Sequence, residues 1–314
     1  MAARLSVVIP SYNRQAPLMR LLESLATQSL SPSDFEVIVV LDGSTDGSAK
    51  AVTSRDWPMV TKVIEQTNAG AGAARNNGAA EATGEYLLFV DDDVVLEPGA
   101  LRNHLTAVQQ CGRVAVLGHL DTIWSSRGVG STNSSIWASL TRLQDLEQIR
   151  FSWCYSGNLL VPRAEFLAVG GFNSAIRRME DCELGYRLDL AGITFVYCRG
   201  AAGTQYNTKS TAEVLDDAAT TGASAMMLFR TEPEFLEAVP RNGRPVRGRA
   251  TRFFAELSTR LPIPMAAGRL AGTLPVWMPG LKPVHNAVWL RWYLLGARKV
   301  SASRAEFVAF LSRR

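Results

Sequence analysis

Residues 85–99 read EYLLFVDDDVVLEPG, an apolar run that ends in three consecutive carboxylates, Asp91, Asp92 and Asp93. The apolar run has the length of a buried strand. A solvated turn before a helix could carry such acids, but adjacent like charges repel, and a bound cation would relieve that repulsion. Mg²⁺ or Mn²⁺ fits because these ions take carboxylate oxygens and bridge to phosphates. The stretch therefore predicts a strand followed by a site for a divalent cation and a phosphate-bearing ligand.

Similar apolar runs occur before and after this stretch, with helical periodicity between them. We expect strands within residues 5–13, 35–44, 59–68 and 85–90, and helices within residues 17–25, 45–56, 71–82 and 100–111. Strands that alternate with helices at this spacing indicate an α/β fold with a mostly parallel sheet flanked by helices.

Polar residues follow each expected strand. Ser11, Asp42, Asn68 and the run 91–93 all come where a strand ends. Asp42 alone would be interpreted as a turn or helix-cap residue. Because ligands of open α/β sheets bind beyond the carboxyl ends of the strands, the shared edge favours a binding site.

A dinucleotide-binding site is the competing interpretation of the glycines after the third strand. Gly70 and Gly72 form part of that fingerprint, with an acidic residue about 20 positions later. Arg75 stands at the third glycine position, and the fingerprint belongs to the first strand–helix turn, which has no glycine here. These departures argue against a dehydrogenase, and the glycines are better suited to a close approach to phosphates or to the start of a helix.

Composition sets the remaining limits. A chain of 314 residues with 47% hydrophobic content can form one large domain or two smaller ones. The four cysteines show no CxxC spacing, which predicts reduced thiols rather than a metal site. The N-terminal apolar stretch is interrupted at Pro10, and no apolar run reaches about 18 residues, so we expect a cytoplasmic chain without a signal peptide or a membrane span.

The C-terminal region is basic. From residue 236 onward, twelve arginines and two lysines stand against three glutamates. Such a surface is suited to an anionic partner, and without a recognisable nucleic-acid module we expect an anionic or lipid-linked acceptor, or contact with the inner face of a membrane, rather than nucleic acid. A merely solvated basic face is equally compatible. Trp289, Trp292 and Leu295 recur at helical spacing, which predicts a helix that packs on the catalytic domain or lies at a membrane interface.

Five blocks together resemble family 2 glycosyltransferases of the GT-A fold. They are SVVIPSYNR, VIVVLDGSTDGS, TNAGAGAARNNGAAEATGEYLLFVDDD, SGNLLVPRAEFLAVGGFN and MEDCELGYRLDLAG, in that order between about residues 5 and 197. The resemblance fades beyond about residue 230. It implies inverting transfer of a sugar from a nucleotide sugar, most often a UDP sugar in this family, to an acceptor hydroxyl with Mn²⁺ or Mg²⁺. We expect a nucleotide-sugar half at 1–115, an acceptor half with the base at 116–230, and a basic helical region at 231–314.

The resemblance also implies roles for single residues on the donor side. Those assigned to the nucleotide sugar are Pro10, Ser11, Asp42, Asn68, Gly70, Arg75, Asp91 and Asp92. Within this set, Asp42 would contact the base, while Pro10 and Ser11 would form the base and ribose pocket. Asp93 would be the main metal ligand with support from Asp91.

A second pair of acids, Glu180 and Asp181, precedes a run of leucines at helical spacing. Alone, they would be first-turn acids that stabilise a helix by about 0.3–1 kcal/mol. Inverting sugar transfer requires a base that takes the acceptor proton. The resemblance implies that Asp181 is this base and that Glu180 orients it. On the acceptor side it implies Trp153, which could equally be a core aromatic residue, and Asn158.

The chain departs from the family pattern at one position. Many relatives carry a metal-binding histidine after the catalytic helix, whereas the histidines here are His104, His119 and His285. Gln205 or Asn207 stands nearest to that position, and an amide oxygen is a weaker ligand than imidazole. Two alternatives stay open, a retaining GT-A enzyme and a catalytically silent nucleotide-sugar-binding subunit.

Overall fold

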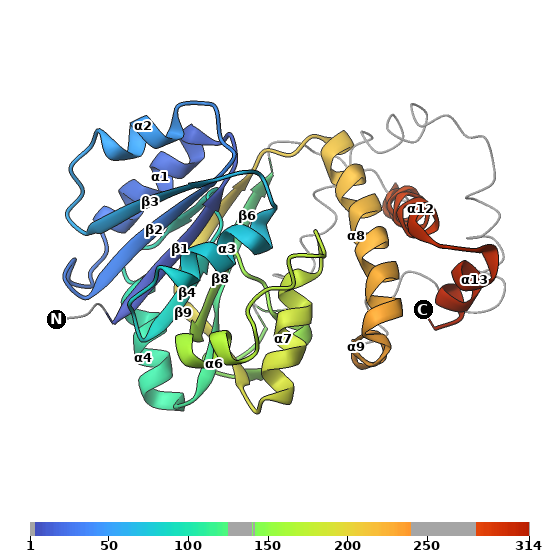
Figure 1. Ribbon diagram of the computed structural model, residues 1–314. Helices are drawn as coiled ribbons and strands as arrows, with labels where there is room; N and C mark the ends of the chain where they lie inside the picture. The colour runs from blue at the N-terminus through green and yellow to red at the C-terminus, as the bar shows by residue number, and fades with distance from the viewer. Residues whose placement is uncertain (1–3, 125–139, 141, 240–280, 314) are drawn as a thin grey trace. The chain divides into compact units, whose positions relative to one another are not determined.

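The computed structural model describes residues 4–124, 140, 142–239 and 281–313. The chain divides into two compact units (Figure 1). Unit 1 comprises residues 1–123, 136–175 and 180–207, and unit 2 comprises residues 124–135, 176–179 and 208–314. Each unit has a hydrophobic core of its own.

Unit 1 is built on one mixed sheet. Its strands are β1 (Leu5–Ser11), β2 (Phe35–Asp42), β3 (Val60–Gln66), β4 (Tyr86–Val90), β5 (Val94–Leu96), β6 (Val114–Trp124), β7 (Gln148–Ile149), β8 (Asn158–Pro162) and β9 (Thr194–Asn207). The order is β3-β2-β1-β4-β8-β6-β9-β5, with β7 paired to β9. The strands β3, β2, β1 and β4 are parallel, whereas β4 pairs with β8, and β5 with β9, in antiparallel fashion.

Helices cover both faces of this sheet. They are α1 (Gln15–Ala26), α2 (Ser48–Thr53), α3 (Ala71–Ala80), α4 (Ala100–Cys111), α6 (Arg163–Ala168) and α7 (Glu180–Leu190). Side chains alternate along a strand, so Val7 and Ile9 pack into a core with α1 and α4, while Val8 packs into a second core with α3 and α7. The expected strand–helix alternation over residues 5–111 is confirmed, with α4 on the expected residues.

The nucleotide-sugar half and the acceptor half were expected as parts of one GT-A domain, and most of their residues lie in unit 1. Strands β6, β8 and β9 join the same sheet as β1–β4, so the two expected halves form one unit. The second unit begins after Asn207 because α8 (Thr211–Thr231) packs on the C-terminal helices.

Unit 2 consists of α8, α9 (Pro233–Ala238), α12 (Leu281–Val300) and α13 (Arg304–Arg313). A Cβ atom on Gly222 of α8 would lie 1.8 Å from the Tyr293 carbonyl oxygen, and one on Gly296 of α12 would lie 1.8 Å from the Ala219 carbonyl oxygen. The two helices therefore cross in backbone contact, which only glycine permits. Trp292 is buried against α8, so the predicted aromatic helix packs within unit 2.

Most of the basic C-terminal sequence, residues 241–269, lies outside the described residues. In the described ranges, no helix combines the length and the hydropathy needed to cross a membrane. The four cysteines are free, as expected.

A buried carboxylate joins three strands at the amino-terminal edge of the parallel sheet. Glu36 on β2 accepts hydrogen bonds of 2.7 Å from Ser6 Oγ on β1 and from the backbone N–H and Oγ of Thr83, just before β4. Lys62 Nζ on β3 lies 2.9 Å from the same carboxylate. Burial alone would raise the pKa of Glu36, but these donors outweigh it and lower the pKa to about 2.

Glu36→Gln should therefore destabilise the protein by about 2 kcal/mol at pH 7. Because the folded-state pKa lies below the unfolded value of 4.5, the contribution is complete above about pH 4.5 and disappears as the pH falls toward 2. Urea unfolding at pH 7 and pH 3 measures this, with Glu23→Gln in an exposed ion pair as the control. If Glu36→Gln and Glu23→Gln lowered the free energy of unfolding equally at pH 7, the buried hydrogen bonds of Glu36 would not stabilise the protein.

Candidate functional site

The site in unit 1 begins where β2 and β3 end. The Asp42 carboxylate accepts hydrogen bonds from Gln66 Nε2 at 2.8 Å and from the backbone N–H groups of Ala69 and Gly70 at 2.7 and 2.8 Å. Asn68 Nδ2 donates to the Asp42 carbonyl oxygen at 2.9 Å. Gly70 has a φ of 96°, which an L side chain rarely adopts. Asp42 thus fixes the turn that leads into α3.

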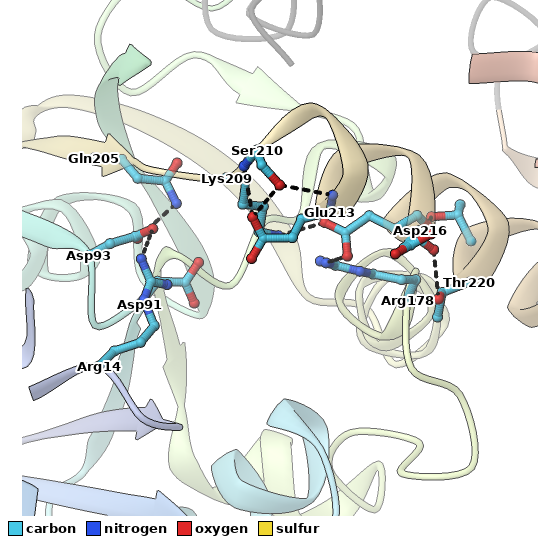
Figure 2. A network of polar contacts seen from close by, with 12 residues as sticks. Arg14, Asp91, Asp93, Arg178, Gln205, Lys209, Ser210, Glu213, Asp216 and Thr220 are labelled. Atoms are coloured by element: carbon cyan, nitrogen blue, oxygen red, sulfur yellow. Dashed lines mark hydrogen bonds and ion pairs between the residues drawn. The ribbon is translucent and has the colours of Figure 1, made fainter. Parts of the chain in front are cut away.

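The aspartate run follows β4 and is held by a residue from the β1–α1 turn. Arg14 Nη1 lies 3.0 Å from Asp92 Oδ1, and Arg14 Nη2 lies 3.1 Å from Asp93 Oδ2. Ser11 Oγ donates to Asp92 Oδ2 at 2.7 Å. Figure 2 shows Arg14 directed at the Asp93 carboxylate. Ser11 and the aspartates are therefore brought together, as the shared strand edge predicts.

Burial is the largest influence on the pKa values of Asp92 and Asp93. It raises the pKa of Asp92 to about 7, although Arg14 and Ser11 oppose the shift. It also raises the pKa of Asp93, and the neighbouring Asp91 carboxylate adds to that rise. Burial, more than repulsion between the carboxylates, therefore favours the protonated form of both groups.

Arg75 links the aspartate run to the second acid pair. Its side chain is buried, with Nη2 2.7 Å from Asp91 Oδ1 and Nη1 3.4 Å from Glu180 Oε1. Its guanidinium lies 5.4 Å from the centroid of the Phe172 ring. An arginine presents a rigid fork of donors, so one side chain can hold two carboxylates from distant segments. Arg75 therefore sets the distance between the two acidic segments.

Asp181 occupies the first turn of α7. Its Oδ1 accepts a hydrogen bond from the Cys182 N–H at 2.8 Å. Burial raises the pKa of Asp181, while Arg75 and the backbone N–H groups of Cys182 and Ser156 work in the opposite direction. A half-buried carboxylate with a raised pKa can accept a proton near neutral pH. The group has the properties that a general base requires.

Tyr155 and Gln205 form the other side of the aspartate run. The Gln205 Nε2 atom donates to Asp93 Oδ1 at 3.0 Å, and the Tyr155 hydroxyl lies 3.2 Å from Gln205 Nε2 and 3.4 Å from Asp91 Oδ2. Antiparallel pairing of β5 with β9 sets Gln205 opposite Val94. Gln205, one of the two residues nearest to the expected histidine position, thus contacts the aspartate run.

The two residues predicted for the acceptor side lie in different surroundings. Asn158 is fully buried, with its amide hydrogen-bonded to His104 Nε2 and to the Ala201 carbonyl oxygen, both at 2.8 Å. The geometry argues against an acceptor role for Asn158, because its side chain belongs to the core. Trp153, in the 3₁₀ helix η2 (Phe151–Trp153), is half-buried beside the second core.

A separate polar group lies within unit 2. Lys209 Nζ is 2.6 Å from Asp217 Oδ2, and Arg178 pairs with the other oxygen of the same carboxylate. Ser210 caps α8 through a reciprocal pair of hydrogen bonds with Glu213. Figure 2 draws this network as well. Lys209 is therefore paired with Asp217.

Three side chains of this region were not predicted from the sequence. Arg14 and Tyr155 contact the aspartates, and Tyr12, at the end of β1, is 51% exposed. The rule that ligands bind beyond the carboxyl ends of parallel strands could have found Tyr12 and Arg14, since both follow β1 directly. Tyr155 precedes an antiparallel strand and had no such signal.

The donor set suits a divalent cation. Among the described residues, no group of three or more histidine, cysteine, aspartate and glutamate side chains is arranged to hold a metal ion. However, Arg14 and Arg75 pair with four carboxylates, those of Asp91, Asp92, Asp93 and Glu180, and Asp181 is a fifth acid in the Arg75 environment. The excess of negative charge and the oxygen-only donors are what Mn²⁺ or Mg²⁺ requires.

The chain is similar to known proteins in both sequence and structure. The sequence profile of glycosyl transferase family 2 matches residues 6–177. Validoxylamine A glucosyltransferase from Streptomyces hygroscopicus subsp. limoneus is 32% identical over 231 residues, which cover 64% of this chain and 51% of that protein. The chain thus spans about half the length of this curated relative.

Two solved structures establish the fold. The mannosyltransferase PcManGT from Pyrobaculum calidifontis, in complex with GDP-Man and Mn²⁺, matches with a TM-score of 0.65 at 16% identity, covering 96% of this chain and 89% of that one. S. aureus TarS 1-349 in complex with UDP-GlcNAc matches with a TM-score of 0.58 at 18% identity, covering 94% and 91%. The fold is GT-A. Because the family profile matches more than half of the chain, from β1 to the turn before α7, the chain belongs to glycosyl transferase family 2.

Proposed function

We propose that this chain transfers a sugar from a nucleoside diphosphate sugar to an acceptor hydroxyl with inversion at the anomeric carbon. The observation that carries the proposal is the Arg75 bridge, which joins the aspartate run after β4 to the acid pair at the start of α7. The aspartate run suits the donor diphosphate with its cation, and the acid pair suits the acceptor hydroxyl. Family membership and neighbours solved with GDP-Man or UDP-GlcNAc support this division.

Asp181 is the general base in this proposal. Inversion needs a carboxylate that takes the acceptor proton as the anomeric carbon develops positive charge. The raised pKa of Asp181 favours proton uptake, and Glu180 shares Arg75 with Asp91 and so orients the segment. Analysis of the product anomer separates this proposal from a retaining enzyme.

Asp93, supported by Asp91, would hold Mn²⁺ or Mg²⁺, which neutralises charge on the departing diphosphate when it is bound. Gln205, hydrogen-bonded to Asp93, orients that carboxylate. Asp92, fixed by Ser11, lies beside the same edge and is suited to the ribose or the diphosphate.

We propose a UDP sugar as the donor. Asp42, Asn68 and Pro10 lie around the ends of β1 and β2, where Tyr12 adds an exposed ring that can stack on a base. Calorimetric titration with UDP, GDP, dTDP and CDP, each with and without Mn²⁺, tests this. Selective binding of UDP that strengthens with metal would support the proposal. Selective binding of GDP would instead indicate a GDP sugar as the donor. Absence of binding to all four nucleotides would favour a silent subunit.

Asp93→Asn should weaken the binding of UDP in the presence of Mn²⁺ by about tenfold or more, because an amide carries no charge to hold the cation. Binding without metal should change little. Asp56→Asn, at an exposed position, is the matched control. If Mn²⁺ strengthened UDP binding to Asp93→Asn as much as to the wild type, Asp93 would not be the metal ligand.

For the acceptor side we propose Trp153 as a stacking residue. Trp153 belongs to η2, which lies against the first turn of α7, since Cys182 Sγ contacts the Ser152 carbonyl oxygen at 3.8 Å. A half-buried ring there can stack on an acceptor sugar. We further propose that the basic residues after 236 favour an anionic or lipid-linked acceptor at the inner face of a membrane, which flotation with anionic and neutral vesicles would test.

A further inference from the structure

We propose that Arg14 is a resident counter-ion of the aspartate run, and that it moves from Asp92 and Asp93 to the donor diphosphate when the nucleotide binds. In the free protein Arg14 would then oppose metal binding, and the nucleotide would relieve that opposition. This inference rests on the proposed function and deepens it, because it states how the donor and the cation depend on each other.

The first observation is that both oxygens of Asp93 are in use. Oδ1 accepts the hydrogen bond from Gln205 at 3.0 Å, and Oδ2 pairs with Arg14 at 3.1 Å. Each oxygen keeps a lone pair for a cation, but a cation at Oδ2 would lie beside the positive guanidinium of Arg14, whereas the Gln205 amide at Oδ1 is neutral. Arg14 is therefore the partner that opposes a cation at this carboxylate.

The second observation is that the two partners are held very differently. Gln205 is buried within a paired strand, and its amide also lies against the Tyr155 hydroxyl. Arg14 stands in the turn before α1, with 31% of its side chain exposed, and the contacts described for its guanidinium are those to Asp92 and Asp93. Arg14 can therefore leave without disturbing the sheet, whereas Gln205 cannot.

The third observation concerns where Arg14 can go. It follows β1 at the edge of the sheet where ligands of α/β folds bind. A guanidinium pairs with a diphosphate through two parallel hydrogen bonds, as it does with a carboxylate. A bound diphosphate would thus replace both aspartates as the partner of Arg14 and free Asp93 for the cation.

The consequence is a measurable coupling between nucleotide and metal, which is reciprocal by thermodynamic linkage. Without nucleotide, Arg14→Ala should bind Mn²⁺ at least tenfold more tightly than the wild type, as measured by electron paramagnetic resonance of free Mn²⁺. The factor by which UDP strengthens Mn²⁺ binding should fall by about tenfold in the variant, because only direct contacts between the ion and the diphosphate remain.

The controls separate charge from contact. Arg55→Ala removes an exposed arginine paired with Glu23 and should leave Mn²⁺ binding unchanged. Arg14→Gln, which keeps most of the side-chain length, should behave like Arg14→Ala, and thermal unfolding of both verifies the fold. Unchanged or weaker Mn²⁺ binding by both Arg14 variants would overturn the counter-ion role, and an unchanged effect of UDP would overturn the transfer to the diphosphate. Failure of the wild type to bind any nucleotide would instead refute the proposed function.

Discussion

Asp181→Asn should reduce kcat for sugar transfer by about 10³-fold while leaving nucleotide binding within about twofold of the wild type. The amide has the shape of the carboxylate but cannot take the acceptor proton. Because the Asp181 carboxylate accepts its hydrogen bonds from the backbone N–H groups of Cys182 and Ser156, the donor side should be little disturbed. Turnover and calorimetric titration with UDP and Mn²⁺ measure the two quantities.

The pH profile provides the sharper test of the same residue. Burial raises the pKa of Asp181 above its ordinary value of 3.8. The value of kcat/KM should therefore rise with pH as Asp181 loses its proton, with a midpoint above pH 3.8. Asp181→Asn should lose this ascending limb. Asp189→Asn, an exposed position on the same helix, should keep both the limb and the turnover. Wild-type turnover in Asp181→Asn would exclude it as the base.

Arg75→Met should destabilise the protein by about 3–5 kcal/mol, since a buried ion pair that loses one partner leaves uncompensated charge. Here Asp91 and Glu180 would both lose their counter-ion, in a region where burial is already the largest influence on Asp181. A fall of roughly 10 °C in the midpoint of thermal unfolding is expected. Arg55→Met, in an exposed ion pair, should cost less than about 1 kcal/mol.

The destabilisation by Arg75→Met should also depend on pH. Arg75 opposes the rise that burial causes in the pKa of Asp181, so this pKa should rise further in the variant, which then gains a proton and relative stability as the pH falls. The difference from the wild type should thus be smaller at pH 5 than at pH 8. Arg75→Lys keeps the charge but loses the forked set of donors, so its stability should lie between those of the wild type and Arg75→Met. A pH-independent loss would indicate that packing, including the contact with Phe172, dominates.

The first half of unit 1 could be predicted because its periodicity is local. Leu18, Leu21, Leu22 and Leu25 recur at the helical period between two strands buried on both faces, and such strands are parallel. The antiparallel pairings of β8 with β4 and of β9 with β5 depend on which distant segments lie side by side. No local period in the sequence encodes those pairings.

The candidate site shows the same limit. Ser11 and Asp92 could be predicted to meet, because both end neighbouring strands. The contact of Tyr155 with Asp91 requires the position of a segment 64 residues later. Asn158 was assigned to the acceptor because a polar residue in a motif suggests a ligand, whereas here its partner is a buried histidine.

The long separations across the site have a consequence for folding. Arg75 and Glu180 are 105 residues apart, and Asp93 and Gln205 are 112 apart. Loops of this length must close before these contacts repay their entropy, so they should form after the local strand–helix pairs and slow the final phase of folding. During synthesis, the parallel strands β1–β4 leave the ribosome well before α7 and β9. A nascent chain that ends at residue 177 would therefore carry the whole aspartate run and still lack Asp181, the proposed base.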